Sequence, residues 1–436
     1  NVSGANDATR YYFSAGVTDQ SGIIKRNDFR RISMLGNFDT KVGKMLTIGG
    51  KIQYSNELNE AAASSGSIPG AAFATAGLGR VPLITAPNVA PFNNDGTYNV
   101  SGQFIGVMNN RVGQVGFNNP AIALDQNRSN SENNRFLGNM FAELRPLSGL
   151  AIRTQYSVDY LNTENEIYLS PQSGEGFGNN GSATSSFANR KNWVWTTTAQ
   201  YDFKVSSAHN FSVLGGVEQQ RITAKSFGLN RIVVNDPDFT NIQGGWATPN
   251  IAGLGIGESY LVSEFGRLNY NFDKKYFISA NIRRDGASQL GSDRKYGTFW
   301  GVSAGWEIAN ENFWATSKLS SIFSSMKLRG SYGRVGNIAG LGDFASLSTF
   351  GSGLYGQTGT LVFNQVGNNL LGWETSNKLD IGLNFGFLND RITAELSYYN
   401  NDVDGLILNV PAPPRAGMPS SVRSEERRVG KECRSR

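Results

Sequence analysis

Apolar and polar residues alternate with a period of two through most of this chain, and this alternation constrains the fold more than any other feature. Residues 192–203 show it clearly, because one face collects apolar side chains and the other polar ones: Trp193, Trp195, Ala199, Tyr201 and Phe203 against Asn192, Thr196, Thr198, Gln200 and Asp202. Successive side chains of a β-strand point to opposite faces of a sheet. The pattern recurs in residues 299–308, 378–387 and 391–398, so we predict an all-β protein.

The alternating segments are each about 9 to 14 residues long, which suits tilted strands that cross a bilayer. We predict about 13 of them, with boundaries uncertain by about 2 to 4 residues. Their expected starts lie near Thr9, Arg31, Leu46, Arg135, Leu150, Asn192, Asn210, Ser259, Tyr276, Gly297, Met326, Thr375 and Arg391.

Short and long connections alternate between the predicted strands. The long ones are expected at residues 56–134, 162–191, 223–258 and 335–374, and the short ones contain residues that tolerate turn geometry: Gly43, Gly149, Asp273, Asn389 and Asp390. Residues 309–325 are an exception that we interpret as a turn with one or two helical turns. Outer-membrane barrels have short periplasmic turns and long extracellular loops, whereas propellers and sandwiches have evenly spaced strands. The spacing therefore favours a transmembrane antiparallel β-barrel.

Composition excludes several other classes. No apolar run approaches the roughly 18 residues of a spanning helix, and the negative mean hydropathy does not separate soluble proteins from barrels, whose apolar residues occupy every second position. The formal net charge of +5 gives no nucleic-acid signal. Cys433 is the only cysteine, so a disulfide framework and a thiolate metal site are excluded.

Five stretches together resemble the SusC/RagA-like family of TonB-linked, or TonB-dependent, outer-membrane transporters. They are Val2–Asp7 with Tyr11, Tyr12 and Asp19–Lys25; Arg267–Phe272 with Arg283–Ser288; Val302–Trp306; Lys327–Gly333 with Gly336 and Asn337; and Trp373–Thr375 through Asp380–Leu383 to Tyr398, Tyr399 and Leu406–Leu408. The resemblance covers most of the chain.

The resemblance implies a barrel of 22 strands around a plug, in the Gram-negative outer membrane, that imports oligosaccharides or peptides with energy from TonB and with a SusD-like surface lipoprotein as partner. About 13 of the 22 strands are expected here, without the plug. The first residues lack the basic and apolar regions of a secretory signal, so we expect the chain to begin within a longer protein. Unpaired strand edges in a membrane are costly, which also requires further strands.

We expect residues 1–410 to form the partial barrel and 411–423 to begin the next extracellular loop. Residues 424–436 lose the alternation and carry five Lys or Arg against three Glu. This segment resembles translated sequencing-adaptor sequence, so we expect a non-native tail; a genuine basic tail is the alternative.

No catalytic, cofactor or metal site is expected. The only histidine, His209, is predicted to be a solvated turn residue, and Gly253–Gly257 a flexible loop rather than a phosphate-binding loop, since no helical pattern follows it. Arg283, Arg284 and Asp285 are expected to form ion pairs at the barrel rim, with binding of an acidic ligand as the alternative. Aromatic residues of the alternating strands, which include Trp193, Trp195, Tyr270, Trp300 and Trp306, are expected to face outer-membrane lipids.

Substrate contacts are expected instead from aromatic residues in the long loops: Phe92, Tyr98, Trp246 and Tyr355. Packing among loops or against a lipoprotein is the alternative for these rings. Two other functions remain open at this point: a soluble secreted adhesin or glycan-binding protein, and a barrel-embedded hydrolase, which the single histidine disfavours. The transported substrate is not determined by these residues.

Overall fold

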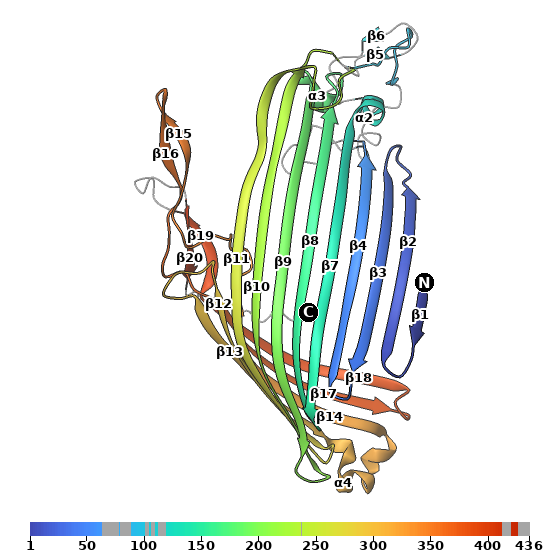
Figure 1. The fold of residues 1–436 in the computed structure, drawn as a ribbon, viewed down its shortest axis with the longest axis vertical. Coiled ribbons are helices and arrows are strands. Elements are labelled where there is room, and N and C mark those ends of the chain that lie inside the picture. Colours follow the sequence, from blue (N-terminus) through green and yellow to red (C-terminus); the bar gives the residue numbers. More distant parts are fainter. Residues whose placement is uncertain are drawn as a thin grey trace.

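One antiparallel sheet dominates the computed structural model of the chain (Figure 1). The structure describes residues 1–62, 78, 89–100, 104–105, 110–111, 119–236, 238–411 and 420–425. The fourteen strands of this sheet are β1 Val2–Ala5, β2 Thr9–Ser21, β3 Asp28–Val42, β4 Leu46–Ala61, β7 Arg128–Leu147, β8 Leu150–Leu169, β9 Ser182–Lys204, β10 His209–Val234, β11 Trp246–Phe272, β12 Tyr276–Ala287, β13 Tyr296–Glu307, β14 Phe323–Asn337, β17 Glu374–Phe387 and β18 Ile392–Asp404.

Every strand of this sheet pairs with its neighbours in chain order, so the topology is an up-and-down meander. The 13 predicted strands are all present, and the short β1 is an additional strand that the alternation did not reveal. Within the described residues the sheet is open, with β1 and β18 at its two edges. Figure 1 shows the sheet curling, so that β14, β17 and β18 are inclined to the earlier strands.

Three small two-stranded sheets lie outside the main one: β5 Phe104–Ile105 with β6 Asn110–Arg111, β15 Thr349–Tyr355 with β16 Thr358–Gln365, and β19 Leu406–Pro411 with β20 Ser420–Glu425. The β15–β16 hairpin stands away from the sheet (Figure 1). The β19–β20 pair occupies part of the segment that was expected to begin a loop. Residues 426–436 of the expected tail lie outside the described residues, so the assignment of the tail stays a prediction.

Helices are short and lie between strands: α2 Pro120–Gln126, α3 Gly174–Phe177, η1 Ile308–Asn310, α4 Asn312–Ala315 and η2 Lys318–Ser321. The last three confirm the helical turns predicted within residues 309–325. Among the helices that the structure describes, none has both the length and the apolar character needed to cross a membrane.

The strands extend further than the alternation predicted. The expected loops 162–191 and 223–258 are wrong in extent, because β8 continues to Leu169, β9 begins at Ser182, β10 continues to Val234 and β11 begins at Trp246. Loop 56–134 is also shorter, since β4 ends at Ala61 and β7 begins at Arg128, whereas loop 335–374 matches within 3 residues the gap between β14 and β17. The missed strand ends mix polar, small and apolar residues without a sustained apolar-polar alternation.

Two further expectations from the sequence are wrong. Gly253–Gly257 lies inside β11 rather than in a flexible loop. His209 is not a solvated turn residue, because it begins β10 and its ring packs 4.7 Å from the ring of Phe272. Both segments are strands because each pairs with a long neighbouring strand. The local composition of the sequence does not reveal this pairing.

The short turns have the chemistry that the sequence predicted. Gly43, Gly149, Asp273, Asn389 and Asp390 all have positive φ, between 47° and 86°. Such angles suit tight hairpins and are least costly for Gly, Asn and Asp.

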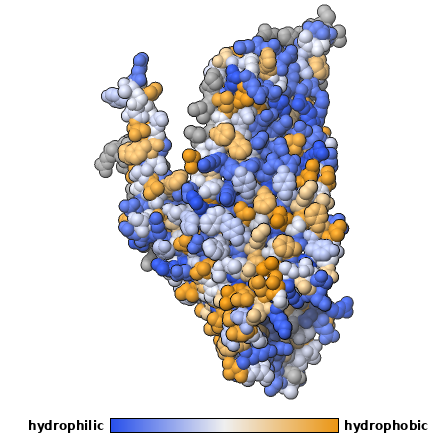
Figure 2. Space-filling model, viewed as in Figure 1, coloured by the Kyte–Doolittle hydropathy of each residue, from blue (hydrophilic) through white to orange (hydrophobic). Residues whose placement is uncertain are grey.

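Buried hydrophobic side chains are few and lie in small clusters near strand ends. One cluster joins Tyr168, Ala183, Val234 and Trp246, and another joins Ala287, Leu290, Ala345 and Leu371. The body of the sheet exposes both faces. In the view of Figure 2, hydrophilic residues cover much of the upper half of the strands and hydrophobic residues gather mainly over the lower half.

The β7–β8 turn provides a test of this fold. Ala at Gly149 would keep the positive φ of 86° and would also drive its Cβ into the carbonyl oxygen of Asp202. Ala at Gly43, where φ is 71°, would meet no atom within 4 Å. We expect Gly43→Ala to lower the free energy of unfolding by about 1 kcal/mol, the cost of the left-handed conformation. Gly149→Ala should lower it by roughly a further 1–3 kcal/mol through the clash.

Denaturant unfolding of the complete receptor in detergent measures both values. Equal losses for the two variants would contradict the predicted approach of the β7–β8 turn to β9.

Candidate functional site

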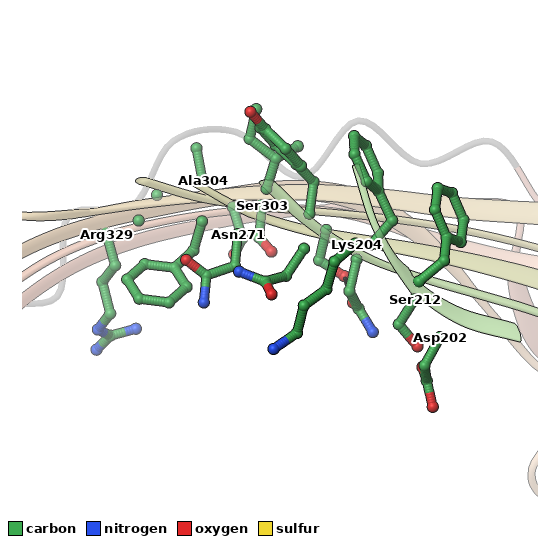
Figure 3. A pocket seen from close by; sticks show the side chains of 18 of the residues that line it. Asp202, Lys204, Ser212, Asn271, Ser303, Ala304 and Arg329 are labelled. Atoms are coloured by element: carbon green, nitrogen blue, oxygen red, sulfur yellow. Dashed lines mark hydrogen bonds between the residues drawn. The ribbon is translucent and has the colours of Figure 1, made fainter. Parts of the chain in front are cut away.

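The register of the strands gives the sheet two chemically different faces. The polar face carries Asp202, Ser212, Asn271, Ser303 and Arg329, five of the side chains labelled in Figure 3. The apolar face carries aromatic and aliphatic side chains that are at least 40% exposed on neighbouring strands: Trp195, Tyr201, Val213, Val217, Leu268, Ile278, Ile282, Trp300, Val302, Leu328, Tyr332 and Ile381. The alternation in the sequence therefore persists across the sheet.

Aromatic rings form a continuous band on the apolar face at the short-turn end, which we call the lower aromatic band. Consecutive ring centroids lie 4.7 to 6.4 Å apart along the series Tyr201, Phe203, Phe211, Tyr270, His209, Phe272, Tyr276 and Trp306. The series crosses five strands, from β9 to β13. His209 belongs to this band through its rings and through a 2.8 Å hydrogen bond between its Nδ1 and the Tyr270 hydroxyl.

A second aromatic group, the upper aromatic band, lies on the same face. Trp193 is 6.1 Å from Tyr156 on one side and 6.1 Å from Tyr260 on the other, between ring centroids. Ten residues of β9 separate Trp193 from Phe203, which corresponds to about 33 Å along the strand, or about 23 Å at a tilt near 45°. Transmembrane barrels have an apolar band about 25 Å tall between two aromatic girdles. The spacing of the two bands matches that height.

On the polar face, Arg283 connects three strands. Its Nη2 donates to Glu218 at 2.8 Å and to Ser263 at 2.7 Å, and its Nε donates to Asp285 at 2.6 Å. The guanidinium also lies 5.3 Å from the centre of the Phe265 ring. Arg284 points to the opposite face, over Tyr296. The expectation of an ion pair between Arg283 and Asp285 is confirmed, and Glu218 is a further partner that the sequence did not indicate.

Arg329 has a similar role nearer the β18 edge. It donates to Asp380 at 2.6 Å, to Ser397 at 2.9 Å and to Asn384 at 3.2 Å, and it pairs with Glu395. These partners come from β17 and β18, 51 to 68 residues away in the chain. No local pattern signals this network, because only the register brings the residues together.

The two arginines belong to a wall of hydrogen-bonding groups. A concave surface of about 1080 Å³ lies at its lower end (Figure 3). Polar residues that include Lys204, Asn269, Asn271, Ser279 and Ser331 line it, together with rings of the lower aromatic band. Figure 3 shows Ala304 on the opposite side of the sheet from Arg329 and Lys204. Among the described residues, no group of three or more His, Cys, Asp or Glu could hold a metal ion. Such a wall can solvate polar molecules along its length.

Of the four predicted loop aromatics, two lie together. Phe92 and Tyr98 form an isolated bridge with ring centroids 5.2 Å apart, and Phe92 is 45% exposed. The Tyr98 hydroxyl donates to Asp125 at 3.0 Å, and Asp125 also accepts from Lys25 at 2.6 Å. The Lys25 ammonium lowers the pKa of the Asp125 carboxyl, and burial together with Asp125 raises the pKa of Tyr98. No local pattern in the sequence indicates the contact between Lys25 and Asp125, because the two residues lie 100 positions apart.

The other two aromatics differ in exposure. Trp246 is only 4% exposed, packs edge-on against Tyr168 and donates from Nε1 to the carbonyl of Asn241 at 2.8 Å. The expectation of an exposed ring is wrong for Trp246, which supports the loop instead. Tyr355, at the tip of the β15–β16 hairpin, is 85% exposed. Three aromatics thus offer ring surface, from two separate parts of the structure.

Comparison with known proteins agrees with this architecture. A family described as TonB dependent receptor-like, beta-barrel matches residues 72–435. TonB-dependent receptor P26 of Formosa agariphila is 29% identical over 97% of this chain and 41% of its own length. TonB-dependent receptor SusC of Bacteroides thetaiotaomicron is 28% identical over 92% of this chain and 40% of its own length. The chain thus spans less than half the length of these relatives.

Solved structures show the same fold. The RagAB peptide transporter superposes with a TM-score of 0.77 at 24% identity, over 97% of this chain and 46% of that one. The matched relatives are receptors and transporters rather than enzymes. The two-faced meander, the paired aromatic bands and the match over most of the sequence lead to one assignment: this chain belongs to the TonB dependent receptor-like β-barrel family.

Proposed function

We propose that the complete receptor containing this chain imports bulky nutrients across the outer membrane, with energy from TonB. The two-faced sheet carries the proposal. Its apolar face, which carries two aromatic bands about 23 Å apart at a tilt near 45°, suits lipid contact, and its polar face suits the wall of an aqueous or plugged lumen. Family membership supports the same function, because the relatives are TonB-dependent receptors.

The ligand class that we propose is an oligosaccharide or a peptide. The RagAB peptide transporter shares this fold, which supports a peptide, and the resemblance of the sequence to SusC/RagA-like transporters is also compatible with an oligosaccharide. A SusD-like lipoprotein is the proposed partner at the surface, next to the long connections. Phe92, Tyr98 and Tyr355 are the proposed ligand contacts, since exposed rings stack on sugars and pack against peptide side chains.

Fractionation and uptake together test the proposal. The complete receptor should remain in the outer-membrane fraction after washing with alkaline carbonate, and cells should accumulate a fluorescent oligosaccharide or peptide only when the proton gradient is intact. A receptor that is released without detergent would favour the soluble adhesin instead. Uptake that persists without the proton gradient would contradict the role of TonB.

Aromatic truncations separate ligand contact from loop support. Tyr355→Ala and Phe92→Ala each remove an exposed ring, so we expect weaker ligand binding by about 2- to 13-fold with little change in stability, since stacking on one ring is worth about 0.5–1.5 kcal/mol. Trp246→Ala removes a buried ring and should instead lower stability by roughly 3–5 kcal/mol. Isothermal titration and denaturant unfolding of the complete receptor measure the two effects. Unchanged binding in both exposed-ring variants would contradict their assignment.

The Asp125 contact predicts a pH dependence of the Phe92–Tyr98 surface. The pKa of Asp125 is lowered in the folded protein, so the carboxylate contributes stability above its unfolded pKa, near about 4. That contribution is lost as pH falls through the lower folded value. Asp125→Asn removes the charge at every pH, and we expect faster amide exchange in residues 23–27 and 120–126 at neutral pH.

Hydrogen exchange, corrected for intrinsic rates, measures this effect. Asp95→Asn is the matched control, because the partner of Asp95 among the described residues is Thr97 of the same loop. Protection that is equal in wild type and Asp125→Asn at neutral pH would show that the Lys25–Asp125 pair does not hold the loop.

A further inference from the structure

Three basic residues lie on the apolar side of the sheet, one within the upper aromatic band and two beyond it. They are Lys191 of β9 and Arg221 and Lys225 of β10, and all three side chains are exposed. β9 and β10 are hydrogen-bonded neighbours, so the three residues form one surface, which we call the basic patch.

The strand register fixes the height of the basic patch relative to the rings. Arg221 pairs directly with Trp193 on one side and with Tyr260 on the other. Lys191 lies two residues beyond Trp193, which is about 7 Å along the strand or about 5 Å in height at a tilt of 45°. Lys225 lies four residues beyond Arg221, about 9 Å in height by the same estimate.

The headgroup layer on each side of a bilayer is about 5–7 Å thick. Lys191 and Arg221 therefore lie within that layer if the upper aromatic band marks the edge of the hydrocarbon. A lysine side chain is long and flexible enough to direct its ammonium toward the headgroups from Lys225.

Acidic neighbours neutralise only part of the charge. Glu258 pairs with Arg221 at 2.6 Å, and this contact uses Nε and Nη2 of the guanidinium. Among the residues that the structure describes, neither Lys191 nor Lys225 has an ion pair within 4.0 Å, whereas basic residues of the polar face such as Arg283 and Arg329 are paired. Glu264 of β11 is on the same side of the sheet, but it pairs with Val217 of β10, between the two aromatic bands. The basic patch thus keeps two uncompensated lysines.

We propose that the basic patch binds the phosphate groups of an outer-leaflet lipid of the lipid A type. The inference rests on the proposed membrane location. Lys191 at headgroup height and Lys225, whose side chain reaches down to that layer, supply mobile point charges. Arg221 adds guanidinium N–H donors, and the flanking Trp193 and Tyr260 rings contact the upper ends of the acyl chains. The site would hold a phosphorylated lipid against β9 and β10 without any contact with the lumen.

The test uses the complete receptor in phosphatidylcholine nanodiscs doped with bisphosphorylated lipid A, dephosphorylated lipid A or phosphatidylglycerol. Native mass spectrometry measures the lipid that stays bound after release from the nanodisc. We expect wild type to retain bisphosphorylated lipid A preferentially. The Lys191→Gln/Lys225→Gln variant should retain about 20-fold less, since each cation near an anionic surface is worth about a fivefold change in affinity.

The matched control is Lys51→Gln/Lys378→Gln, which removes the same charge from exposed lysines on the polar face. It should bind lipid as wild type does. Equal retention of dephosphorylated lipid A, equal retention by the two double variants, preference for phosphatidylglycerol, or displacement of lipid A by millimolar inorganic phosphate would each overturn the proposal.

The outcome is separable from that of the proposed function. A receptor that does not insert into any nanodisc contradicts the membrane location itself. A receptor that inserts normally, but whose lipid retention ignores Lys191 and Lys225, contradicts only the lipid site.

Discussion

Backbone hydrogen bonding between neighbouring antiparallel strands is the interaction on which the whole structure depends. The part of the chain that the structure describes has no central hydrophobic core, and its few buried apolar clusters lie near strand ends. The long strands β9, β10 and β11, of 23, 26 and 27 residues, are held instead by continuous pairing with their neighbours. Each strand follows its partner in the chain. Tight turns, several with left-handed residues, fix the register where they join two strands, as between β3 and β4 or between β7 and β8.

The fixed register places polar residues of neighbouring strands on one face of the sheet and apolar residues on the other, so that both faces are continuous. A slip of one residue between any two strands would move polar side chains to the apolar face. Ion pairs on the polar face also oppose such a slip. Arg283 of β12 pairs with Glu218 of β10, and Arg329 of β14 pairs with Asp380 of β17 and Glu395 of β18. These networks keep the wall of the proposed lumen rigid and hydrophilic, while the two aromatic bands define the height at which the opposite face suits lipid.

The proposed recognition surface is separate from this scaffold. The exposed rings of Phe92 and Tyr355 lie in connections beyond the main sheet, and Tyr98 donates to a carboxylate that Lys25, from a distant turn, also contacts. Loop residues can change without disturbing strand pairing, so a common sheet can carry connections for different ligands.

The sequence by itself determined the all-β class, the 13 long strands, the turn residues with positive φ and the family. Each of these depends on local chemistry: alternation between lipid-facing and polar positions, or the backbone freedom of Gly, Asn and Asp. Tertiary structure alone decided the strand ends, where the apolar-polar alternation is not sustained. It also placed Gly253–Gly257 within β11, buried Trp246, and joined Lys25 to Asp125 and Arg329 to Glu395. These features arise from pairing between residues far apart in the chain, which leaves no local signal in the sequence.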